Sequence, residues 1–352
     1  MNDVLKNMTG RYAKWLTGEG KYSDIIISSR ARLARNLQNF PFVTRTTEDQ
    51  RSEILSSVLD AAKDSKILNS LYFFDMSAVD ELDAQFLKER HIISHEFIGM
   101  SDPKGFFFSE DESIGIMINE EDHIRMQVIH SGFSLNETWF EIHRLDEEFS
   151  KKLSYAYSDR FGYLTACPTN VGTGVRFSVF VHLPVLTFTK RIDKIFADLI
   201  PAGITVRGLY GEGSKVIGNF FQISNQYTLG WTEQGIMDRV IPIIRQFISE
   251  EKKARENIMN DQRIVIEDKI YRTIGILSKA MILSSMEFLD HLSALRLGVD
   301  LGILPKISKR LLNELLIMTQ PAHIQKIHGR KLEELERDSI RAEMVREKLN
   351  LN

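Results

Sequence analysis

The sequence has a single cysteine, Cys167, among 352 residues. One thiol cannot close an internal disulfide, so nothing in the sequence favours an oxidising compartment. No run approaches the about eighteen consecutive apolar residues of a membrane span. The first residues, MNDVLKNMTGRYAKWL, lack the apolar core and the small-residue cleavage site of a signal peptide. These absences predict a cytoplasmic protein that does not enter the membrane.

The chain also lacks an excess of charge of one sign. The formal net charge is −3, which argues against a protein that mainly binds nucleic acid, and we predict no direct nucleic-acid binding. Hydrophobic residues make up 43% and charged residues 26%, as in ordinary globular proteins. The length is sufficient for more than one domain.

Two common templates for ATP-dependent phosphoryl transfer are missing. The segment GEGSKVIG (211–218) contains glycine and lysine, but it lacks the spacing of a P-loop. The glycine-rich loop, HRD and DFG motifs of ordinary protein kinases do not occur in order. Any phosphoryl transfer by this chain must therefore use other residues.

The type of predicted structure changes near residue 250. Before it, short β-rich runs alternate with helical stretches. The runs occupy residues 24–28, 113–118, 175–184, 203–208 and 218–224, and the helical stretches 48–63 and 232–253. After it, only helical patterns remain, and the charge run EEKKARE (250–256) is typical of a solvated helix face. We predict an α+β domain over 1–254, with an antiparallel sheet flanked by helices, and a smaller all-α domain over 255–352.

Four segments place arginines or carboxylates at the end of a predicted strand, where loops commonly carry binding groups. They are SSRARLARNL (28–37), NEEDHIRM (119–126), CPTNVGTGVRF (167–177) and VRGLYGEGS (206–214). Their arginines have planar groups of donors that match phosphate oxygens, and their glutamates can grip a guanidinium or accept its proton. Each segment alone is more often a surface salt bridge, a turn or a buried thiol. Together they predict a site for a triphosphate and a guanidinium.

These four segments, in this order, resemble the phosphagen (guanidino) kinase family, and most closely its bacterial protein arginine kinases. The resemblance covers about residues 20–250, and the NEEDH and CPTN-x-GTG segments are its most specific parts. As in those bacterial proteins, SSRAR begins only at Ser28, and about a hundred residues follow the kinase-like part. The resemblance implies an ATP-dependent protein arginine kinase.

The resemblance also implies roles for individual residues. The ATP-binding arginines would be Arg30, Arg32, Arg125, Arg176 and Arg207. Glu121 would be the catalytic base, Glu212 its partner, and Cys167 a thiolate that orients the guanidinium. Gly172 and Gly174 would let the backbone approach the nucleotide. Tyr210 and Phe180 stand where metabolic members have an arginine and a histidine, so phosphate and adenosine contacts are expected to differ there.

The C-terminal part contains RDSIRA (337–342), which by itself is typical of a charged, solvated helix face. In the bacterial kinases a similar motif is implicated in binding phosphoarginine, which here would involve Arg337, Asp338 and Arg341. The resemblance further implies a homodimer, protein substrates with exposed arginines, a heat-shock repressor, an activator protein and a Clp-type unfoldase.

We expect ATP and Mg²⁺ as the cofactors, with the metal held by the nucleotide phosphates and water rather than by protein ligands. Two alternatives remain open at this point. The chain could be a metabolic kinase that acts on free arginine, or an inert adaptor that binds phosphoarginine.

Overall fold

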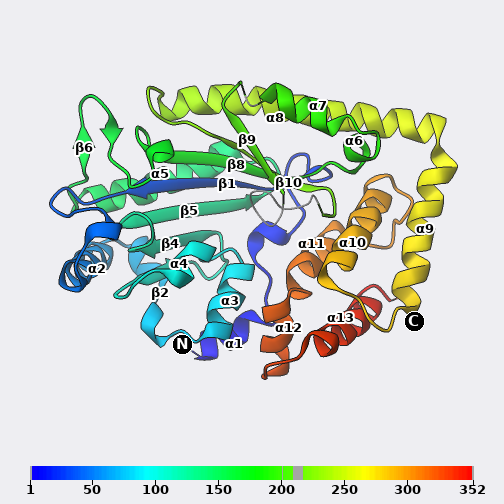
Figure 1. Ribbon diagram of the computed structural model, residues 1–352, viewed down its shortest axis with the longest axis horizontal. Helices are drawn as coiled ribbons and strands as arrows, with labels where there is room; N and C mark the ends of the chain where they lie inside the picture. Colours follow the sequence, from blue (N-terminus) through cyan, green and yellow to red (C-terminus); the bar gives the residue numbers. More distant parts are fainter. Residues whose placement is uncertain (1, 200, 209–216, 351–352) are drawn as a thin grey trace.

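The computed structural model describes residues 2–199, 201–208 and 217–350. Within these residues the strands form one eight-stranded antiparallel sheet and a small hairpin of β6 (Tyr157–Ser158) and β7 (Gly162–Tyr163). The order in the large sheet is β2 (Tyr72–Asp75), β3 (Gly105–Phe108), β4 (Ile114–Ile118), β5 (Ile124–Ser131), β1 (Ile26–Arg35), β8 (Val175–His182), β10 (Phe220–Asn225) and β9 (Ile204–Gly208). Helices flank this sheet and continue beyond it (Figure 1), so the predicted fold class is confirmed.

Successive side chains of a strand point to opposite faces of the sheet, and the two faces differ in chemistry. On one face, apolar residues such as Ala31 and Phe177 are fully buried. Helices α2 (Glu48–Lys63), α5 (Leu135–Ser150) and α8 (Glu233–Asp261) pack against this side. The other face carries polar and charged side chains, and it is this face that forms the candidate site.

Short helices and turns complete the sheet-bearing part. They are α1 (Asn2–Met8), α3 (Glu81–Glu89), α4 (His95–Gly99), α6 (Pro184–Phe188) and α7 (Ile192–Leu199), with 3-10 turns η1 (Lys14–Leu16), η2 (Val43–Arg45), η3 (Leu68–Ser70), η4 (Met76–Ala78) and η5 (Pro168–Asn170). The C-terminal helices are α9 (Arg263–Lys279), α10 (Ser285–Asp300), α11 (Lys309–Met318), α12 (Pro321–His328) and α13 (Glu334–Lys348). No helix in the described ranges combines the length and the apolarity needed to cross a membrane.

The change from mixed to all-helical structure takes place inside a helix. The division that we predict at residues 254 and 255 falls within α8, which runs without a break to Asp261. Every described strand lies before that point, and α9 to α13 follow it. In Figure 1 these helices gather at one end of the sheet, beside the N-terminal segment.

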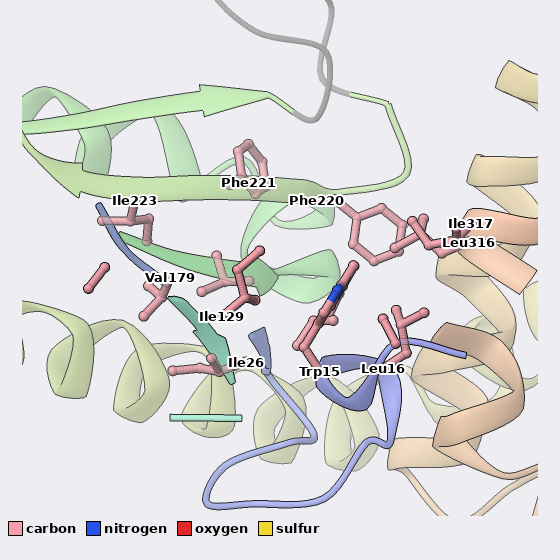
Figure 2. Close-up of a cluster of buried hydrophobic side chains, with 14 of the residues drawn as sticks. Trp15, Leu16, Ile26, Ile129, Val179, Phe220, Phe221, Ile223, Leu316 and Ile317 are labelled. Carbon is pink, nitrogen blue, oxygen red and sulfur yellow. The ribbon is translucent and has the colours of Figure 1, made fainter. Parts of the chain in front are cut away.

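The two parts of the chain share one hydrophobic core. Figure 2 shows Trp15 and Leu16 from η1 next to Phe220 from β10 and to Leu316 and Ile317 from α11. All of these side chains are buried. The C-terminal helices are therefore packed into the sheet-bearing part rather than tethered to it.

Polar contacts reinforce this packing at the first turn of α12. The carboxylate of Glu89, the last residue of α3, accepts hydrogen bonds from the backbone N–H groups of Ala322 at 2.8 Å and His323 at 2.9 Å. It thus satisfies donors that have no partner within the helix. The neighbouring Arg90 forms a buried ion pair with Glu112 and contacts the His323 ring at 3.1 Å. The end of α3 therefore holds α12 in place.

The expectation that EEKKARE is a solvated helix face is wrong for two of its charged residues, Glu251 and Arg255. Glu251 is 0% exposed and Arg255 is 6% exposed. The Glu251 carboxylate accepts hydrogen bonds from Arg255 Nε at 2.9 Å and from the backbone N–H groups of Val185 and Leu186 at the start of α6. The charges are buried because α6, distant in sequence, supplies these partners.

We expect Glu251→Ala to lower the free energy of unfolding by about 1–3 kcal/mol, because it leaves buried backbone N–H groups at the start of α6 without an acceptor. Arg255 loses its nearest carboxylate but keeps Asp24 at 3.8 Å and Asp300 at 3.7 Å. The measurement is urea-induced unfolding. Glu256→Ala removes an exposed carboxylate from the same run and serves as the control, with an expected change within about 0.5 kcal/mol. If Glu251→Ala and Glu256→Ala changed the free energy of unfolding equally, the buried contacts of Glu251 would not stabilise the fold more than an exposed carboxylate does.

Candidate active site

All five predicted phosphate-binding arginines lie on one face of the sheet. Arg30 and Arg32 are two residues apart in β1, and Arg32 pairs directly with Arg176 of β8. Arg125 of β5 pairs with Ala34, and Arg207 of β9 pairs with Gln222 of β10, both on the same face. Directly paired residues of antiparallel strands point the same way. The sheet therefore brings together residues from four separate strands.

The arginines lie within strands, not in loops after strand ends. The predicted strand at 24–28 is in fact β1, which begins at Ile26 and runs on to Arg35. Arg30 and Arg32 are therefore central in the sheet, and Arg30 donates to Gln222 Oε1 at 3.1 Å across the intervening strand β8. Four of the five arginines are consequently held by internal strands of the sheet, and Arg207 by the edge strand β9.

Burial and mutual repulsion make this cluster unfavourable without an anion. Burial, together with the charges of the other four arginines, lowers the pKa of Arg32 well below its ordinary value. Burial and the charges of Arg125 and Arg176 lower the pKa of Arg30 to about 10. The buried Nε of Arg32 has no hydrogen-bond partner among the residues that the structure describes. A polyanion such as a triphosphate would supply both the missing charge and the missing acceptor.

The NEED segment forms the turn of the β4–β5 hairpin. Asn119 adopts a φ of 61°, a left-handed conformation that asparagine tolerates better than most residues. The carboxylate of Glu120 is fully buried, pairs with Arg125 and accepts hydrogen bonds from Ser94 Oγ at 2.6 Å and from the backbone N–H of Glu121 at 2.7 Å. Glu120 thus fixes the turn from which the next residue projects.

Glu121 has the environment of a proton acceptor. Its side chain is half-buried next to the Glu120–Arg125 pair. Burial first, and then the charge of Asp122, raise the pKa of Glu121; the charges of Glu120 and Glu96 add to this, while Arg125 opposes it. A carboxylate with a raised pKa accepts a proton more readily than an ordinary glutamate.

Asp122 ties this turn to the segment that carries the cysteine. Its Oδ1 accepts hydrogen bonds from Asn36 Nδ2 at 2.6 Å and from the backbone N–H of Ala166 at 2.7 Å. Cys167, directly after Ala166, is half-buried, and its Sγ lies 3.1 Å from Thr169 Oγ1. Asp122 therefore holds Cys167 and Glu121 on the same side of the site.

The two glycines after the cysteine are required by the protein's own backbone. Gly172 has a φ of 115° and Gly174 a φ of 68°. A Cβ at Gly172 would lie 2.7 Å from the Thr228 carbonyl oxygen, and one at Gly174 would lie 2.6 Å from that of Ala34. These approaches explain both glycines, and their contact with a nucleotide stays a prediction.

Two further residues of the quoted segments, Glu212 and His123, differ in whether the structure describes them. Glu212, the expected partner of Glu121, lies outside the described residues, as does Tyr210.

His123, in the NEEDH segment, accepts a hydrogen bond at Nδ1 from the backbone N–H of Leu37 at 2.9 Å, so Nε2 carries the proton and donates to the Pro41 carbonyl at 2.9 Å. Burial lowers its pKa to about 4. His123 is therefore a neutral structural residue.

A cleft of ≈ 980 Å³ opens over the arginine-bearing face. Its floor includes Arg32 and Arg125, and one wall is formed by α3 and α4. The opposite wall comes from the C-terminal helices, through residues such as Gln320 and Gln325. No sequence motif marked this wall, because α11 and α12 reach the site only through tertiary packing.

An aromatic recess adjoins the arginines beside Arg30. Trp15, His91 and Phe180 line it together with Gln222. The rings of Trp15 and His91 meet edge to face at 5.4 Å. Burial and the charge of Arg30 lower the pKa of His91 to about 4, so the imidazole is neutral near pH 7. Trp15, His91 and Gln222 were missed from the sequence, because they occur in no recognisable motif.

The residues of RDSIRA do not form a shared surface site in this structure. Arg341 is 1% exposed; its Nε donates to the Thr319 carbonyl at 2.8 Å, and its Nη1 donates to the Leu283 carbonyl at 2.7 Å and to Asp338. Arg337 donates to the Leu332 carbonyl at 2.6 Å. Arg341 thus anchors α13, and the binding of phosphoarginine by Arg337, Asp338 and Arg341 stays a prediction.

The described residues contain no group of three or more His, Cys, Asp or Glu side chains placed to hold a metal ion. Two of the carboxylates at the site are instead engaged by the protein: Glu120 pairs with Arg125 and accepts from the Glu121 backbone N–H, and Asp122 accepts from the Ala166 backbone N–H. This donor set suits a metal ion that arrives already bound to phosphates.

Sequence comparisons identify relatives over nearly the whole chain. The model of the family described as ATP:guanido phosphotransferase, C-terminal catalytic domain, matches residues 52–254, and that of the protein-arginine kinase McsB C-terminal domain matches residues 263–352. A protein of Halothermothrix orenii named protein-arginine kinase is 43% identical over 338 residues, which cover 96% of each chain. The protein of that name from Bacillus subtilis is 41% identical and covers 96% of this chain and 94% of its own.

Solved structures show the same architecture. The duplicated taurocyamine kinase of Schistosoma mansoni, solved with transition-state-analog components, is 26% identical with a TM-score of 0.60, over 66% of this chain and 34% of that one. A lombricine kinase is 23% identical with a TM-score of 0.59, over 67% of this chain and 68% of its own. The second likeness concerns the fold alone.

Proposed function

Because the chain belongs to the ATP:guanido phosphotransferase family, we propose that it is a protein arginine kinase, which transfers the γ-phosphoryl group of ATP to arginine side chains of proteins. The observation that carries this proposal is the identity of more than 40% to protein-arginine kinases over both the sheet-bearing and the helical part. The five-arginine face and the adjacent raised-pKa carboxylate of Glu121 supply matching chemistry.

The arginine face binds the triphosphate. Phosphoryl transfer needs charge stabilisation on the equatorial oxygens and on the departing diphosphate, which fixed guanidinium groups provide without reorganisation. The Nε of Arg32, which has no acceptor among the described residues, would donate to a phosphate oxygen. Mg²⁺, held by the phosphates and water, would neutralise further charge.

Glu121 accepts the proton that makes the substrate nucleophilic. An arginine guanidinium has a pKa above ~12 and cannot attack phosphorus while fully protonated. As a guanidinium nitrogen forms its bond to the γ-phosphorus, the bond from that phosphorus to the bridging oxygen breaks and ADP departs. The nitrogen's proton passes to the Glu121 carboxylate. Cys167, held nearby by Asp122, would orient the guanidinium, and Glu212 would act as the partner of Glu121.

The adenine base is placed next to the aromatic recess. The recess lies directly beside Arg30, so a nucleotide with its phosphates on the arginines has its base within reach of it; its volume of ≈ 50 Å³ is too small to enclose a purine, so the base would bind at its mouth. The partly exposed rings of His91 and Phe180 favour stacking with a purine. Because the imidazole of His91 is neutral near pH 7, it places no charge beside the uncharged adenine base.

The resemblance to the bacterial kinases also supports a proposal about the oligomeric state, the location and the protein partners of this chain. Phosphorylation replaces a cationic side chain by an anionic one, which is a chemically distinct mark. We propose a homodimer that acts in the cytoplasm on protein substrates, including a heat-shock repressor, with an activator protein and a Clp-type unfoldase that recognises marked substrates. In this proposal RDSIRA binds phosphoarginine, once the present contacts of Arg341 are exchanged.

Phosphorus NMR of the purified protein with Mg·ATP tests the proposed reaction. We expect an acid-labile N–P signal with an unstructured arginine-containing protein as substrate, and none with free arginine. A signal with free arginine alone would replace the proposal by a metabolic guanidino kinase. Bound ATP without transfer to either substrate, even with a candidate activator present, would instead indicate an inert phosphoarginine adaptor.

A further inference from the structure

Glu96 is a carboxylate of the cleft wall for which the described residues provide no hydrogen bond or ion pair. It belongs to the first turn of α4, lines the cleft together with Arg125, and is exposed. Of the other carboxylates around the cleft, Glu120 pairs with Arg125 and Glu89 caps α12. Glu81, in the first turn of α3, is exposed like Glu96 and also lacks a described partner, but it is not among the main charges that act on Glu121 and Arg125, whereas Glu96 is. Glu96 is therefore available to a ligand that enters the cleft.

The position of Glu96 is fixed relative to the reacting groups. Ser94 caps α4 by accepting a hydrogen bond from the Phe97 backbone N–H at 3.0 Å, and its hydroxyl donates to Glu120 Oε1 at 2.6 Å. Phe97 is fully buried and packs against Phe106. Because the same Glu120 also pairs with Arg125, a short chain of contacts holds α4 against the NEED turn.

Apart from Lys88 and Lys331 on its walls, the cleft has its cations on the floor and, on α4, a carboxylate without a described partner. The floor carries Arg30, Arg32, Arg125 and Arg207. Glu96 lines the α4 side and is close enough to act electrostatically on both Glu121 and Arg125. A triphosphate is complementary to the first region and a guanidinium to the second. The two reactants of the proposed reaction carry these opposite charges.

We propose that Glu96 is a recognition residue for the polypeptide substrate, whose cationic target side chain it contacts at the cleft wall as that side chain is presented to Glu121. This inference rests on the proposed protein arginine kinase activity and names a specificity-determining carboxylate for it. Since the contact is made both before and during transfer, it contributes to substrate binding rather than to the chemical step.

The test compares steady-state kinetics of the full chain and its Glu96→Gln variant with an unstructured arginine-containing polypeptide and Mg·ATP. We expect the KM for the polypeptide to rise about tenfold, equivalent to about 1.4 kcal/mol, with the KM for ATP and kcat changed less than about threefold. Glu96→Asp, which keeps the charge, should recover most of the affinity. Glu137→Gln, an equivalent charge removal in the exposed first turn of α5 outside the cleft, is the control and should change nothing.

The outcomes separate this inference from the proposed function. An active wild-type protein whose Glu96→Gln variant keeps the same KM for the polypeptide would overturn the role of Glu96 alone. An equal rise in the KM for ATP would also overturn it, because it would indicate a general disturbance of the cleft. A wild-type protein that transfers phosphate only to free arginine would overturn the proposed function, and this inference with it.

Discussion

Glu121→Ala is expected to lower kcat by about 10²–10⁴-fold, the usual contribution of a general base. The substitution removes a half-buried carboxylate with a raised pKa beside Arg125. The pKa of the neighbouring Asp122 is also raised, but its Oδ1 already accepts hydrogen bonds from Asn36 Nδ2 and the Ala166 backbone N–H. Since Glu121 is surrounded by like charges, its loss should not destabilise the fold. Kinetics with a protein substrate, combined with thermal unfolding, provide the measurement. A well-folded and fully active variant would contradict the mechanism.

The wild-type pH profile gives a second view of the same residue. Glu121 must be ionised to accept a proton, and its pKa lies above the ordinary value of 4.5 because of burial and the neighbouring carboxylates. As the pH falls through this raised pKa, the base becomes protonated and kcat/KM declines. The acid limb should therefore lie above pH 4.5, and it should disappear from the residual activity of Glu121→Ala.

Arg32→Met should have opposite effects on activity and stability. We expect kcat/KM to fall by about 10³-fold or more, as for other arginines that stabilise phosphoryl transfer. The melting temperature should rise by about 2 °C for each ~1 kcal/mol gained, because methionine removes a buried charge that the other four arginines repel. Enzyme kinetics and calorimetry without nucleotide measure the two effects. An unchanged kcat/KM would exclude Arg32 from the phosphate site.

Arg35 provides the matched control on the opposite face of the same strand. Its guanidinium forms a buried ion pair with Asp146 at 2.7 Å, donates to the Thr173 carbonyl at 2.9 Å and lies 3.5 Å from the Tyr163 ring. Arg35→Met leaves Asp146 buried without its partner and should cost about 3–5 kcal/mol. If Arg32→Met and Arg35→Met lowered the melting temperature equally, the idea that repulsion from the other arginines makes Arg32 unfavourable in the fold would be wrong.

The convergence of the arginines could be predicted from the sequence, but their place in the fold could not. The segments at 28–37 and 119–126 indicated a phosphate and guanidinium site, and the structure brings their arginines together. β1 was predicted to end at residue 28 because its apolar run stops there. Alternation continues beyond that point, with Ala31 and Leu33 on the core face. When one face of a strand carries charged residues, the average hydrophobicity of the strand is as low as that of a loop, so hydrophobicity alone does not identify it.

Charged residues of the helical part were the hardest to predict. Glu251 and Arg341 occur in runs that are typical of solvated helix faces, yet both are buried. Their partners are the first turn of α6 for Glu251 and the carbonyls of Leu283 and Thr319 for Arg341. The recess residue His91 and the cleft wall at Gln320 depend on similarly distant packing. Local periodicity contains no information about such partners.

The shared core also determines when the cleft can form during synthesis. The sheet and its arginines are encoded by residues up to Asn225, whereas the wall that faces them is made of residues from Leu316 to Lys331. Translation proceeds at about 5–20 residues per second, so several seconds separate the two. During that interval the nascent chain exposes a cationic sheet and the apolar surface that α11 will cover. A ribosome-bound chain thus holds its phosphate site before the C-terminal wall of the cleft has been made.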